Sequence, residues 1–369
     1  MVVCGAMPNR HRLACGISLS QMSITSSLEK YRMDATVNVA MVGATGAVGE
    51  ALLEILSERS FPVDRLYALA SERSVGNTVL FRKRAVAVEC LEGFDFSKVD
   101  IAFFSAGASV SAEFAPQAVD KGCVVIDNTS HFRNDDHIPL VVPEVNPHAL
   151  VDHPGIIANP NCSTIQMVVA LKPLYDAVGL RRVNVSTYQA VSGAGKRAVE
   201  ELAGQTAALL NGQSAKPGVH LKQIAFNVLP AIGALQDNGY TYEEMKMVWE
   251  TQKILEDKTI EVNPTAVRIP VFYGHSEAVH VETRAPISAL EARLLLQAAP
   301  GVVVVDEAEP FDFPTPVTAG AGTDGVYVGR IRGDLSCDNG LNLWVVSDNI
   351  RKGAALNSVQ IAEHLLSRG

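Results

Sequence analysis

Several features of metal-binding, extracellular, membrane and nucleic-acid-binding proteins are missing from this chain. It has no CxxC pair and no Cys/His cluster, and its six cysteines are scattered irregularly. That pattern excludes a zinc site of ordinary spacing and a disulfide framework, and it indicates a reducing compartment. No segment approaches the ~18 consecutive apolar residues of a membrane span. The net charge of −9 and the lack of a long basic run argue against nucleic acid or an anionic membrane as the main partner, but they leave room for a local anion pocket.

The composition that is present is of an ordinary globular kind. The chain has 369 residues, of which 47% are hydrophobic and 19% charged, a length that predicts two domains. Residues 1–36 differ, with Arg, Ser and Met but few acids. They fit an over-long start with Met33 as the true beginning, a flexible tail, or a transit peptide. We therefore expect a soluble cytoplasmic protein, with organellar targeting as the alternative.

Residues 37–58 predict a strand, a glycine turn and a helix. Gly43, Gly46 and Gly49 form a GxxGxxG pattern between an apolar strand at 37–42 and a helix with apolar residues at helical spacing. Glycines at these places let backbone N–H groups approach a pyrophosphate at the helix N-terminus. The motif alone also fits an ordinary strand-to-helix turn.

The chain after this unit favours the nucleotide-binding interpretation. Strand-like stretches recur at 65–71, 99–107 and 123–130 with helical stretches between them, which predicts a Rossmann-type, doubly wound parallel sheet. The second strand ends in "ASERS". Arg73, between Ser71 and Ser74, suits a 2′-phosphate and predicts NADP, although the carboxylate of Glu72 could instead bind the 2′-hydroxyl of NAD.

The stretch "ANPNCSTIQ" places Cys162 at or just before the start of an apolar helix expected to begin near Ser163. A helix N-terminus favours a thiolate over a thiol, as a nucleophile requires, and its N–H groups could stabilise an oxyanion. Most free cysteines, however, are small buried hydrophobic residues. The segment alone fits either interpretation.

The second half of the chain predicts an α+β domain with a mixed sheet. Several long strands with few helices follow residue 180, and the broad face of such a sheet is a plausible subunit interface. We expect a cofactor-binding domain at 37–162, a catalytic and dimerisation domain at 163–347, and a C-terminal helix at 348–369 that packs back on the first domain.

Three polar groups in the chain have both a functional and a structural interpretation. Glu243 and Lys246 share one face of a predicted helix, where a solvated ion pair is the usual outcome. Arg268 and His275 are seven residues apart across a strand and its turn, and the histidine could be an ordinary loop residue. Arg133 follows the carboxyl end of a strand, which borders the ligand crevice in an open α/β sheet.

Taken together and in order, the motifs resemble the aspartate-β-semialdehyde dehydrogenase family over residues 37 to about 367. Any one of them would be unspecific, but the ordered set is highly specific. The resemblance rests on "GATGAVG", "FFSAG", "DNTSHFR", "PLVVPEVNP", "ANPNCST", "STYQAVSGAG", "DNGYTYEEMK", "VRIPVFYGHSE", "FPTP", "VGRIR" and "IRKGAALN".

The resemblance implies a reversible, NADP-dependent reductive dephosphorylation of L-aspartyl-4-phosphate to aspartate semialdehyde and phosphate. This reaction belongs to lysine, threonine, methionine and diaminopimelate biosynthesis. Cys162 would form an acyl-thioester, His275 would be the general acid and base, and Gln189 would help to place the cysteine and the substrate.

The same resemblance implies the binding residues. Arg268 would pair with the substrate α-carboxylate and Glu243 would accept from its ammonium. Arg133 and Lys246 would hold the phosphate, with Asn161 nearby. The implied cofactor contacts are Gly43, Thr45, Gly46, Ala47, Val48, Arg73, Ser74, Ser192, Gly193 and Asn349. A homodimer is expected, with a tetramer as the alternative.

Three other functions were weighed against this one. N-acetyl-γ-glutamyl-phosphate reductase uses a similar thioester, but its cysteine usually lies in a "GCYPT"-like setting, which "NPNCST" does not match. Glyceraldehyde-3-phosphate dehydrogenase would need a different cysteine motif and an NAD-type second strand. A non-catalytic NADP-binding regulatory protein would have no need of an intact Cys162 and His275.

Overall fold

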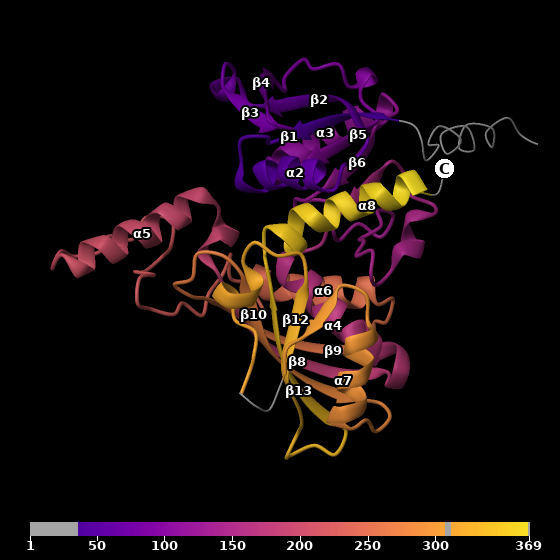
Figure 1. The fold of residues 1–369 in the computed structure, drawn as a ribbon, viewed down its shortest axis with the longest axis vertical. Coiled ribbons are helices and arrows are strands. Elements are labelled where there is room, and N and C mark those ends of the chain that lie inside the picture. Colours follow the sequence, from indigo (N-terminus) through magenta and orange to yellow (C-terminus); the bar gives the residue numbers. More distant parts are fainter. Residues whose placement is uncertain (1–35, 307–310, 368–369) are drawn as a thin grey trace, which may run out of the picture.

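The computed structural model describes residues 36–306 and 311–367, so the expectation for residues 1–36 falls almost wholly outside it. Two sheets lie one above the other, with the C-terminal helix α8 (Leu356–Ser367) between them (Figure 1). Among the described residues, no helix has the length and apolar character needed to cross a bilayer.

The first sheet has seven strands in the order β3-β4-β2-β1-β5-β6-β7, and all neighbours are parallel except β3 and β4. Both faces are covered, because alternate residues of β1 belong to different apolar clusters: Val39 and Met41 pack with α2 and α8, whereas Ala40 and Val42 pack with α3. The predicted doubly wound parallel sheet is confirmed. The bounds are β1 Val37–Val42, β2 Val63–Ala70, β3 Thr78–Phe81, β4 Arg84–Cys90, β5 Ile101–Phe104, β6 Val124–Asp127, β7 Ile156–Ala158, α2 Ala47–Glu58 and α3 Ala108–Asp120.

The second sheet is mixed, as predicted, with the order β11-β12-β13-β10-β8-β9. Strands β9 and β10 follow each other in the chain, yet β8 lies between them, parallel to β9 and antiparallel to β10. Helix α4 packs across four strands, α6 covers β9 and α7 covers β11 and β12. The bounds are β8 Leu180–Gln189, β9 Glu261–Arg268, β10 His275–Thr283, β11 Val302–Val304, β12 Val326–Gly333, β13 Gly340–Ser347, α4 Cys162–Val178, α5 Lys196–Leu210, α6 Tyr242–Ile254 and α7 Ala289–Ala298.

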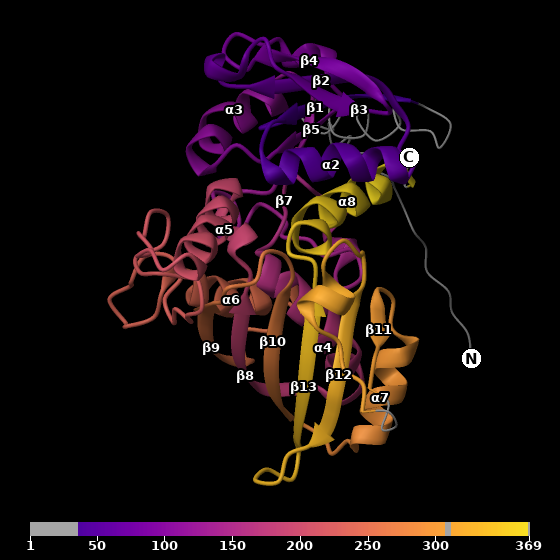
Figure 2. The ribbon, with the colours of Figure 1, turned by 60° about the vertical axis from the view of Figure 1, so that its left-hand side comes forward.

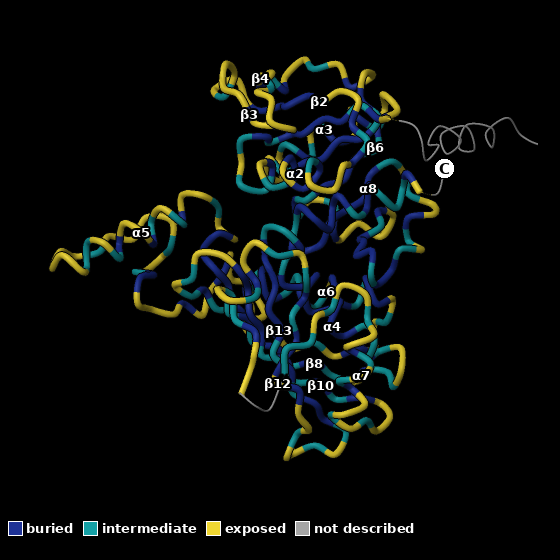
Figure 3. The backbone as a smooth tube through the Cα atoms, viewed as in Figure 1, coloured by how far each residue is buried: buried dark blue, intermediate teal, exposed yellow. Residues whose placement is uncertain are grey.

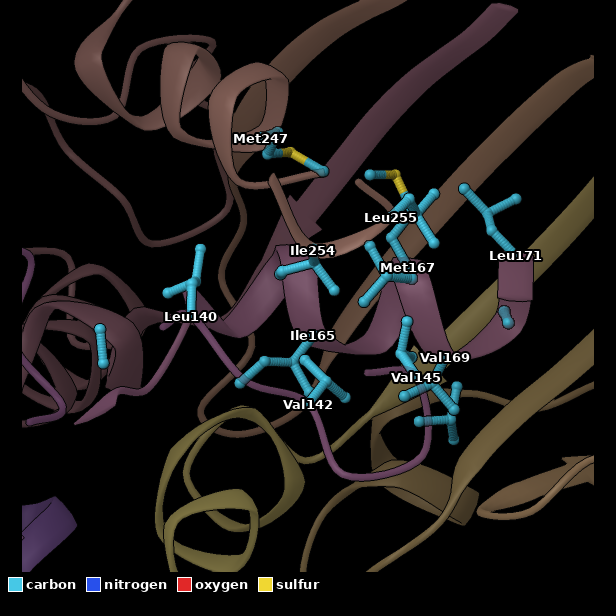
Figure 4. Close-up of a cluster of buried hydrophobic side chains, with 14 of the residues drawn as sticks. Leu140, Val142, Val145, Ile165, Met167, Val169, Leu171, Met247, Ile254 and Leu255 are labelled. Atoms are coloured by element: carbon cyan, nitrogen blue, oxygen red, sulfur yellow. The ribbon is translucent and has the colours of Figure 1, made fainter. Parts of the chain in front are cut away.

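Helix α4 is the centre of the second domain. Its apolar residues Ile165, Met167, Val169 and Leu171 are buried and pack with residues of α6 and of the 140–145 segment (Figure 4). Because every residue from Ser163 to Leu171 is buried, the helix has little freedom to shift. Truncating a fully buried side chain such as Met167 should cost about 2–5 kcal/mol. The rigid packing of α4 fixes the position of its first residue.

Helix α5 and the segment after it stand apart from both sheets. The helix projects from the body of the molecule (Figure 1), and most of its length is exposed or half-buried (Figure 3). A small apolar cluster built on Val191, Leu202 and Ile224 attaches this region to the end of β8.

The chain returns to the first domain through a π-helical turn, Arg351–Ala355, followed by α8. Helix α8 lies beside α2 (Figure 2), and its apolar face shares a buried cluster with that helix. The fully buried Lys352 ammonium donates to Glu144 at 2.7 Å. Burial lowers the pKa of Lys352, against the opposing effect of Glu144. This buried pair ties the turn to the first domain.

Candidate active site

A cleft of about 460 Å³ opens between the two domains, at the carboxyl ends of the first sheet's strands. Ligands bind at this edge of open α/β sheets. Its lining brings together most of the residues selected from the sequence. These are Gly46, Ala47, Val48, Arg133, Asn161, Cys162, Gln189, Ser192, Gly193, Glu243, Lys246, Arg268 and Asn349.

Cys162 is the first residue of α4, one position earlier than predicted. Asn161 caps the helix, because its Oδ1 accepts from the N–H groups of Ser163 at 3.0 Å and Thr164 at 3.4 Å. The effect expected of the helix start, a lower thiol pKa, is outweighed at this position. Burial and the nearby Glu243 carboxylate raise the pKa of Cys162 to about 12, against the opposing effects of Arg268, Lys246 and Arg133.

Gln189, the last residue of β8, joins the start of α4 to the rest of the site. Its Nε2 donates to Ser163 Oγ at 2.9 Å and lies 3.3 Å from Glu243 Oε1. Its Oε1 is 3.5 Å from Arg268 Nη1. The amide of Gln189 therefore links Ser163, the residue after Cys162, to Glu243 and Arg268.

Glu243 and Lys246 form an ion pair at 2.8 Å on the inner face of α6. The structural interpretation of a solvated pair is wrong, because the two side chains are only 10% and 17% exposed. Asn161 Nδ2 also donates to Glu243, at 2.9 Å. Burial would raise the pKa of Glu243, but Lys246, Asn161 and Arg268 lower it to about 2. Glu243 therefore presents a fixed negative charge to the cleft.

Arg268 and His275 come from the ends of β9 and β10, which both flank β8. Arg268 Nη1 donates to the carbonyl of Ala190 at 2.7 Å, and no carboxylate of the described residues forms a salt bridge with it. His275 is fully buried, and its Nδ1 accepts the N–H of Ala190 at 3.0 Å. The neutral ring consequently carries its proton on Nε2, which has no partner among the described residues. Burial and Arg268 lower the pKa of His275 to about 3.

Gly193 lies against both of these side chains, of which Arg268 lines the cleft and His275 does not. A methyl group on it would stand 2.9 Å from Arg268 Nη1 and 3.4 Å from His275 Nε2. Asn349 fixes this turn, since its Nδ2 donates to Ser192 Oγ at 3.0 Å while its Oδ1 accepts from the N–H of Gly274 at 2.9 Å. A larger residue at position 193 would therefore press on both side chains, and the fully buried His275 lies directly behind this glycine.

Arg133, from the segment after β6, also lines the cleft. Its Nη1 donates to Glu250 at 3.2 Å and its Nη2 to the carbonyl of Asn128 at 2.9 Å. The side chain is only 9% exposed, and its Nε has no partner among the described residues. Arg133 and Arg268 therefore supply separate cationic groups to a chain that is acidic overall.

The glycine turn after β1 fits a dinucleotide pyrophosphate. Gly43 has a φ of +91°, and Gly46 is the N-cap of α2 and lines the cleft. A methyl group on Gly49 would stand 2.3 Å from the carbonyl oxygen of Gly43, so this glycine is required for the helix to approach the strand. These are the three tasks of the glycines in a dinucleotide-binding turn: a tight turn, close approach of the ligand and close helix packing.

Four of the residues selected for the cofactor lie outside the lining of this cleft: Gly43, Thr45, Arg73 and Ser74. Arg73 is exposed in the turn Glu72–Ser74, directly after β2. A larger hollow of about 900 Å³ lies between α2 and the β3–β4 hairpin, and Thr45 borders it. That hollow contains no residue selected for catalysis, so the smaller cleft is the candidate active site.

Comparison with known proteins identifies the family of the chain. Residues 38–153 match the family described as semialdehyde dehydrogenase, NAD binding domain, and residues 171–352 match semialdehyde dehydrogenase, dimerisation domain. The aspartate-semialdehyde dehydrogenase of Legionella pneumophila is 62% identical over 335 residues, which are 90% of this chain and 96% of that protein. The chain belongs to the aspartate-semialdehyde dehydrogenase family.

Solved structures of this family have the same fold. Aspartate semialdehyde dehydrogenase II of Vibrio cholerae, complexed with ASA, matches with a TM-score of 0.89 and 60% identity over 90% of this chain and 99% of that one. Aspartate semialdehyde dehydrogenase of Candida albicans with NADP matches with a TM-score of 0.71 and 25% identity over 90% and 99% of the two chains. The family resemblance inferred from the motifs is thus confirmed, and the chain is an oxidoreductase of amino-acid biosynthesis with an NAD(P)-binding domain and a dimerisation domain.

Sequence reasoning missed Glu250 and Gly353, which both contact residues of the candidate site. Glu250 bonds to both Arg133 and the backbone of Asn161, and Gly353 abuts Cys162. Glu250 follows Glu243 and Lys246 at helical spacing, so an extension of the same helix face to position 250 could have found it. Among the described residues, no group of three or more His, Cys, Asp or Glu side chains could hold a metal ion.

Proposed function

We propose that this chain reversibly converts L-aspartyl-4-phosphate to L-aspartate 4-semialdehyde and phosphate, with NADP as cofactor and Cys162 as nucleophile. The observation that carries the proposal is that a thiol and two separate arginines line one cleft. A substrate with a carboxylate at one end and a phosphate at the other needs two such cations. Arg268 takes the α-carboxylate and Arg133, with Lys246, takes the phosphate.

The fixed charge of Glu243 suits the substrate ammonium. Burial and Glu243 raise the pKa of Cys162 to about 12, against the opposing effects of Arg268, Lys246 and Arg133. A bound ammonium next to Glu243 offsets one cause of the raised pKa. The proton that the thiol loses as it attacks leaves with the phosphate, which departs as hydrogen phosphate.

The proposed reaction has two steps at the same carbonyl carbon: transfer of the acyl group to Cys162, and reduction of the thioester. Cys162 Sγ attacks the acyl phosphate, the carbon–oxygen bond to phosphate breaks, and a thioester forms. The bound cofactor supplies the hydride that reduces this thioester. As the proposed general acid, His275 shares its Nε2–H with the oxygen of the tetrahedral adduct and stabilises the negative charge that forms there. The carbonyl then re-forms, the carbon–sulfur bond breaks, the aldehyde leaves and Cys162 is released as a thiolate, while Gln189 keeps the start of α4 in place throughout.

The proposed cofactor assignment is NADP, held by residues 37–162. The support is the glycine turn at 43–49, the exposed Arg73 after β2, and the related Candida albicans structure with NADP. The remaining contacts are proposed for Ser74, Ser192 and Asn349. The same proposal assigns residues 163–347 to the catalytic and dimerisation domain and the C-terminal segment, described as far as Ser367, to the first domain.

We also propose a homodimer that uses the face of the second sheet opposite α4. Residues on that face of β8, β10 and β13 are half-buried and include His280 and Trp344. The match to a dimerisation domain over residues 171–352 supports this assignment. Light scattering on the eluting protein should give twice the chain mass. A monomer would contradict the proposal.

A coupled test of substrate and activity uses the purified protein with aspartate semialdehyde, phosphate and NADP, followed by the absorbance of reduced nicotinamide. We expect turnover that depends on phosphate and is absent with N-acetylglutamate semialdehyde. Activity with the second substrate alone would replace this function with that of N-acetyl-γ-glutamyl-phosphate reductase.

A further inference from the structure

Glu250 on α6 is an almost fully buried carboxylate, 1% exposed, that touches two parts of the site at once. Its Oε2 accepts the backbone N–H of Asn161 at 2.6 Å, and its Oε1 accepts from Arg133 Nη1 at 3.2 Å. Removing a carboxylate from water is costly unless its oxygens are well paired. These two bonds therefore account for a charge at this depth.

On one side, Glu250 restrains the guanidinium of Arg133. That group is held at Nη1 by Glu250 and at Nη2 by the carbonyl of Asn128, while its Nε–H has no partner among the described residues. The two restraints fix the plane of the guanidinium, and Nη1 and Nη2 each carry a second N–H beyond these two bonds. Because Arg133 lines the cleft, these N–H groups are the donors proposed for an oxyanion there.

On the other side, Glu250 restrains the residue that precedes the nucleophile. Asn161 is the N-cap of α4, and its side-chain oxygen accepts from the first turn of the helix. A bond to its backbone N–H therefore fixes the cap and, one residue later, Cys162. Glu250 is therefore bonded to Arg133 and to Asn161, the residue before Cys162. It connects Arg133 to the start of α4.

We propose that Glu250 is a positioning residue that orients Arg133 for phosphate and holds Asn161, so that the phosphate and the thiol sulfur meet in one fixed geometry. The inference rests on the proposed function, because Arg133 is the phosphate ligand there. Glu250 itself touches neither substrate nor cofactor. It acts through the two groups to which it is bonded.

An opposite role for Glu250 predicts an effect of opposite sign. If the carboxylate served mainly to offset the charge of Arg133, its removal would free a cation and tighten phosphate binding. If it positions Arg133, its removal weakens phosphate binding although the cleft gains positive charge. The direction of the change in phosphate KM therefore distinguishes the two roles.

Glu250→Gln is the sharpest variant, because it keeps the size of the side chain. An amide can accept the short Asn161 bond, but it then presents an NH₂ group to Arg133, which has only donors. We expect the KM for phosphate to rise about tenfold, as for loss of one charge-assisted hydrogen bond. The KM for aspartate semialdehyde should stay within about twofold, since Arg268 and Glu243 are not bonded to Glu250.

The matched control is Glu244→Gln, a buried glutamate of the same helix. Its carboxylate completes the capping box with Thr241 and accepts the N–H of Ala266 at 2.9 Å, contacts that serve only the fold. This variant should lower Tm and leave the ratio of the two KM values unchanged. The Glu244→Gln variant shows whether destabilising α6 is by itself enough to change the ratio of the KM values for phosphate and aspartate semialdehyde.

Three results would overturn the role of Glu250: an unchanged phosphate KM, a lower one, or a parallel rise in both KM values.

A measurement without turnover separates this inference from the proposed function. Inorganic phosphate should raise the Tm of the wild-type chain, and Glu250→Gln should need about tenfold more phosphate for the same rise. An equal phosphate requirement would contradict the inference. A wild-type chain without phosphate-dependent turnover would contradict only the proposed function.

Discussion

Gly353 and Cys162 are in such close contact that a methyl group on Gly353 would stand 2.8 Å from Cβ of Cys162 and 3.2 Å from its Cα. Gly353 belongs to the π-helical turn that Lys352 ties to Glu144. The C-terminal segment therefore forms the wall behind the proposed nucleophile, and the fold of the last 20 or so residues bears directly on the site.

Gly353→Ala should lower kcat about tenfold or more, because the added methyl displaces the backbone of Cys162 and a misplacement near 1 Å can cost about 100-fold. Steady-state kinetics with aspartate semialdehyde, phosphate and NADP measures this. Gly204→Ala is the matched control, since a methyl group there meets nothing within 4 Å. It should leave kcat unchanged and stabilise α5 slightly. Equal kcat in the two variants would contradict the contact.

Arg268→Lys should raise the KM for aspartate semialdehyde about tenfold or more. A lysine keeps the charge but loses the planar fork that binds a carboxylate through two bonds. The control is Arg182→Lys, at a partly exposed arginine paired with Glu261 on the same sheet, which should leave KM unchanged. An unchanged KM in Arg268→Lys would remove it from the carboxylate site.

His275 should make the protein less stable as the pH falls below neutrality. Its pKa is held near 3 by burial and Arg268, so the unfolded chain binds more protons than the folded one between pH 6.5 and 3. Between pH 7 and 5.5 this residue should remove about 1 kcal/mol of the free energy of unfolding. Urea unfolding at both pH values should show a smaller loss for His275→Asn. Glu243 does not interfere, because its pKa is lowered from 4.5 to about 2 and its effect on stability therefore changes only below about pH 4.5. Equal losses would show that His275 is not buried in the neutral form.

Arg73→Ala should reduce the preference for NADP over NAD, measured as the ratio of kcat/KM values, about tenfold. The exposed guanidinium after β2 has the position and charge to meet a 2′-phosphate. Glu72→Gln should leave the ratio at or above its wild-type value. A wild-type ratio at or below one would refute the NADP assignment.

The fold could be predicted where the sequence pattern is local. The strand at 37–42 was placed correctly because an unbroken apolar run before glycines is typical of a buried parallel strand. The β3–β4 hairpin was missed because its turn is made by Arg82 and Lys83 at φ values of +48° and +63°, where Asn-Gly is the usual signal. The place of β8 between β9 and β10 is set by long-range pairing, which no local pattern reveals.

In the candidate site too, features set by local sequence could be predicted, whereas those set by contacts between distant residues could not. The local pattern predicted a helix start at Cys162 and a strand end before Arg133, and both residues line the cleft. The helix start alone left a nucleophile and a buried hydrophobic residue equally open at Cys162, and the family resemblance favoured the nucleophile. The direction of the thiol pKa could not be predicted, because it depends on burial and on Glu243, which is 81 positions further along the chain. Gly353 lies further still, and only the return of α8 to the first domain brings it against the cysteine.

The central claim is that Cys162 carries the acyl group, and withholding phosphate tests it most directly. With aspartate semialdehyde and NADP alone, the wild-type chain should release one reduced nicotinamide per chain in a burst and then stop. Peptide mass spectrometry should find the aspartyl group on Cys162, and Cys162→Ser should show neither burst nor adduct while remaining folded. Sustained turnover by Cys162→Ser, or an adduct at another residue, would contradict the account.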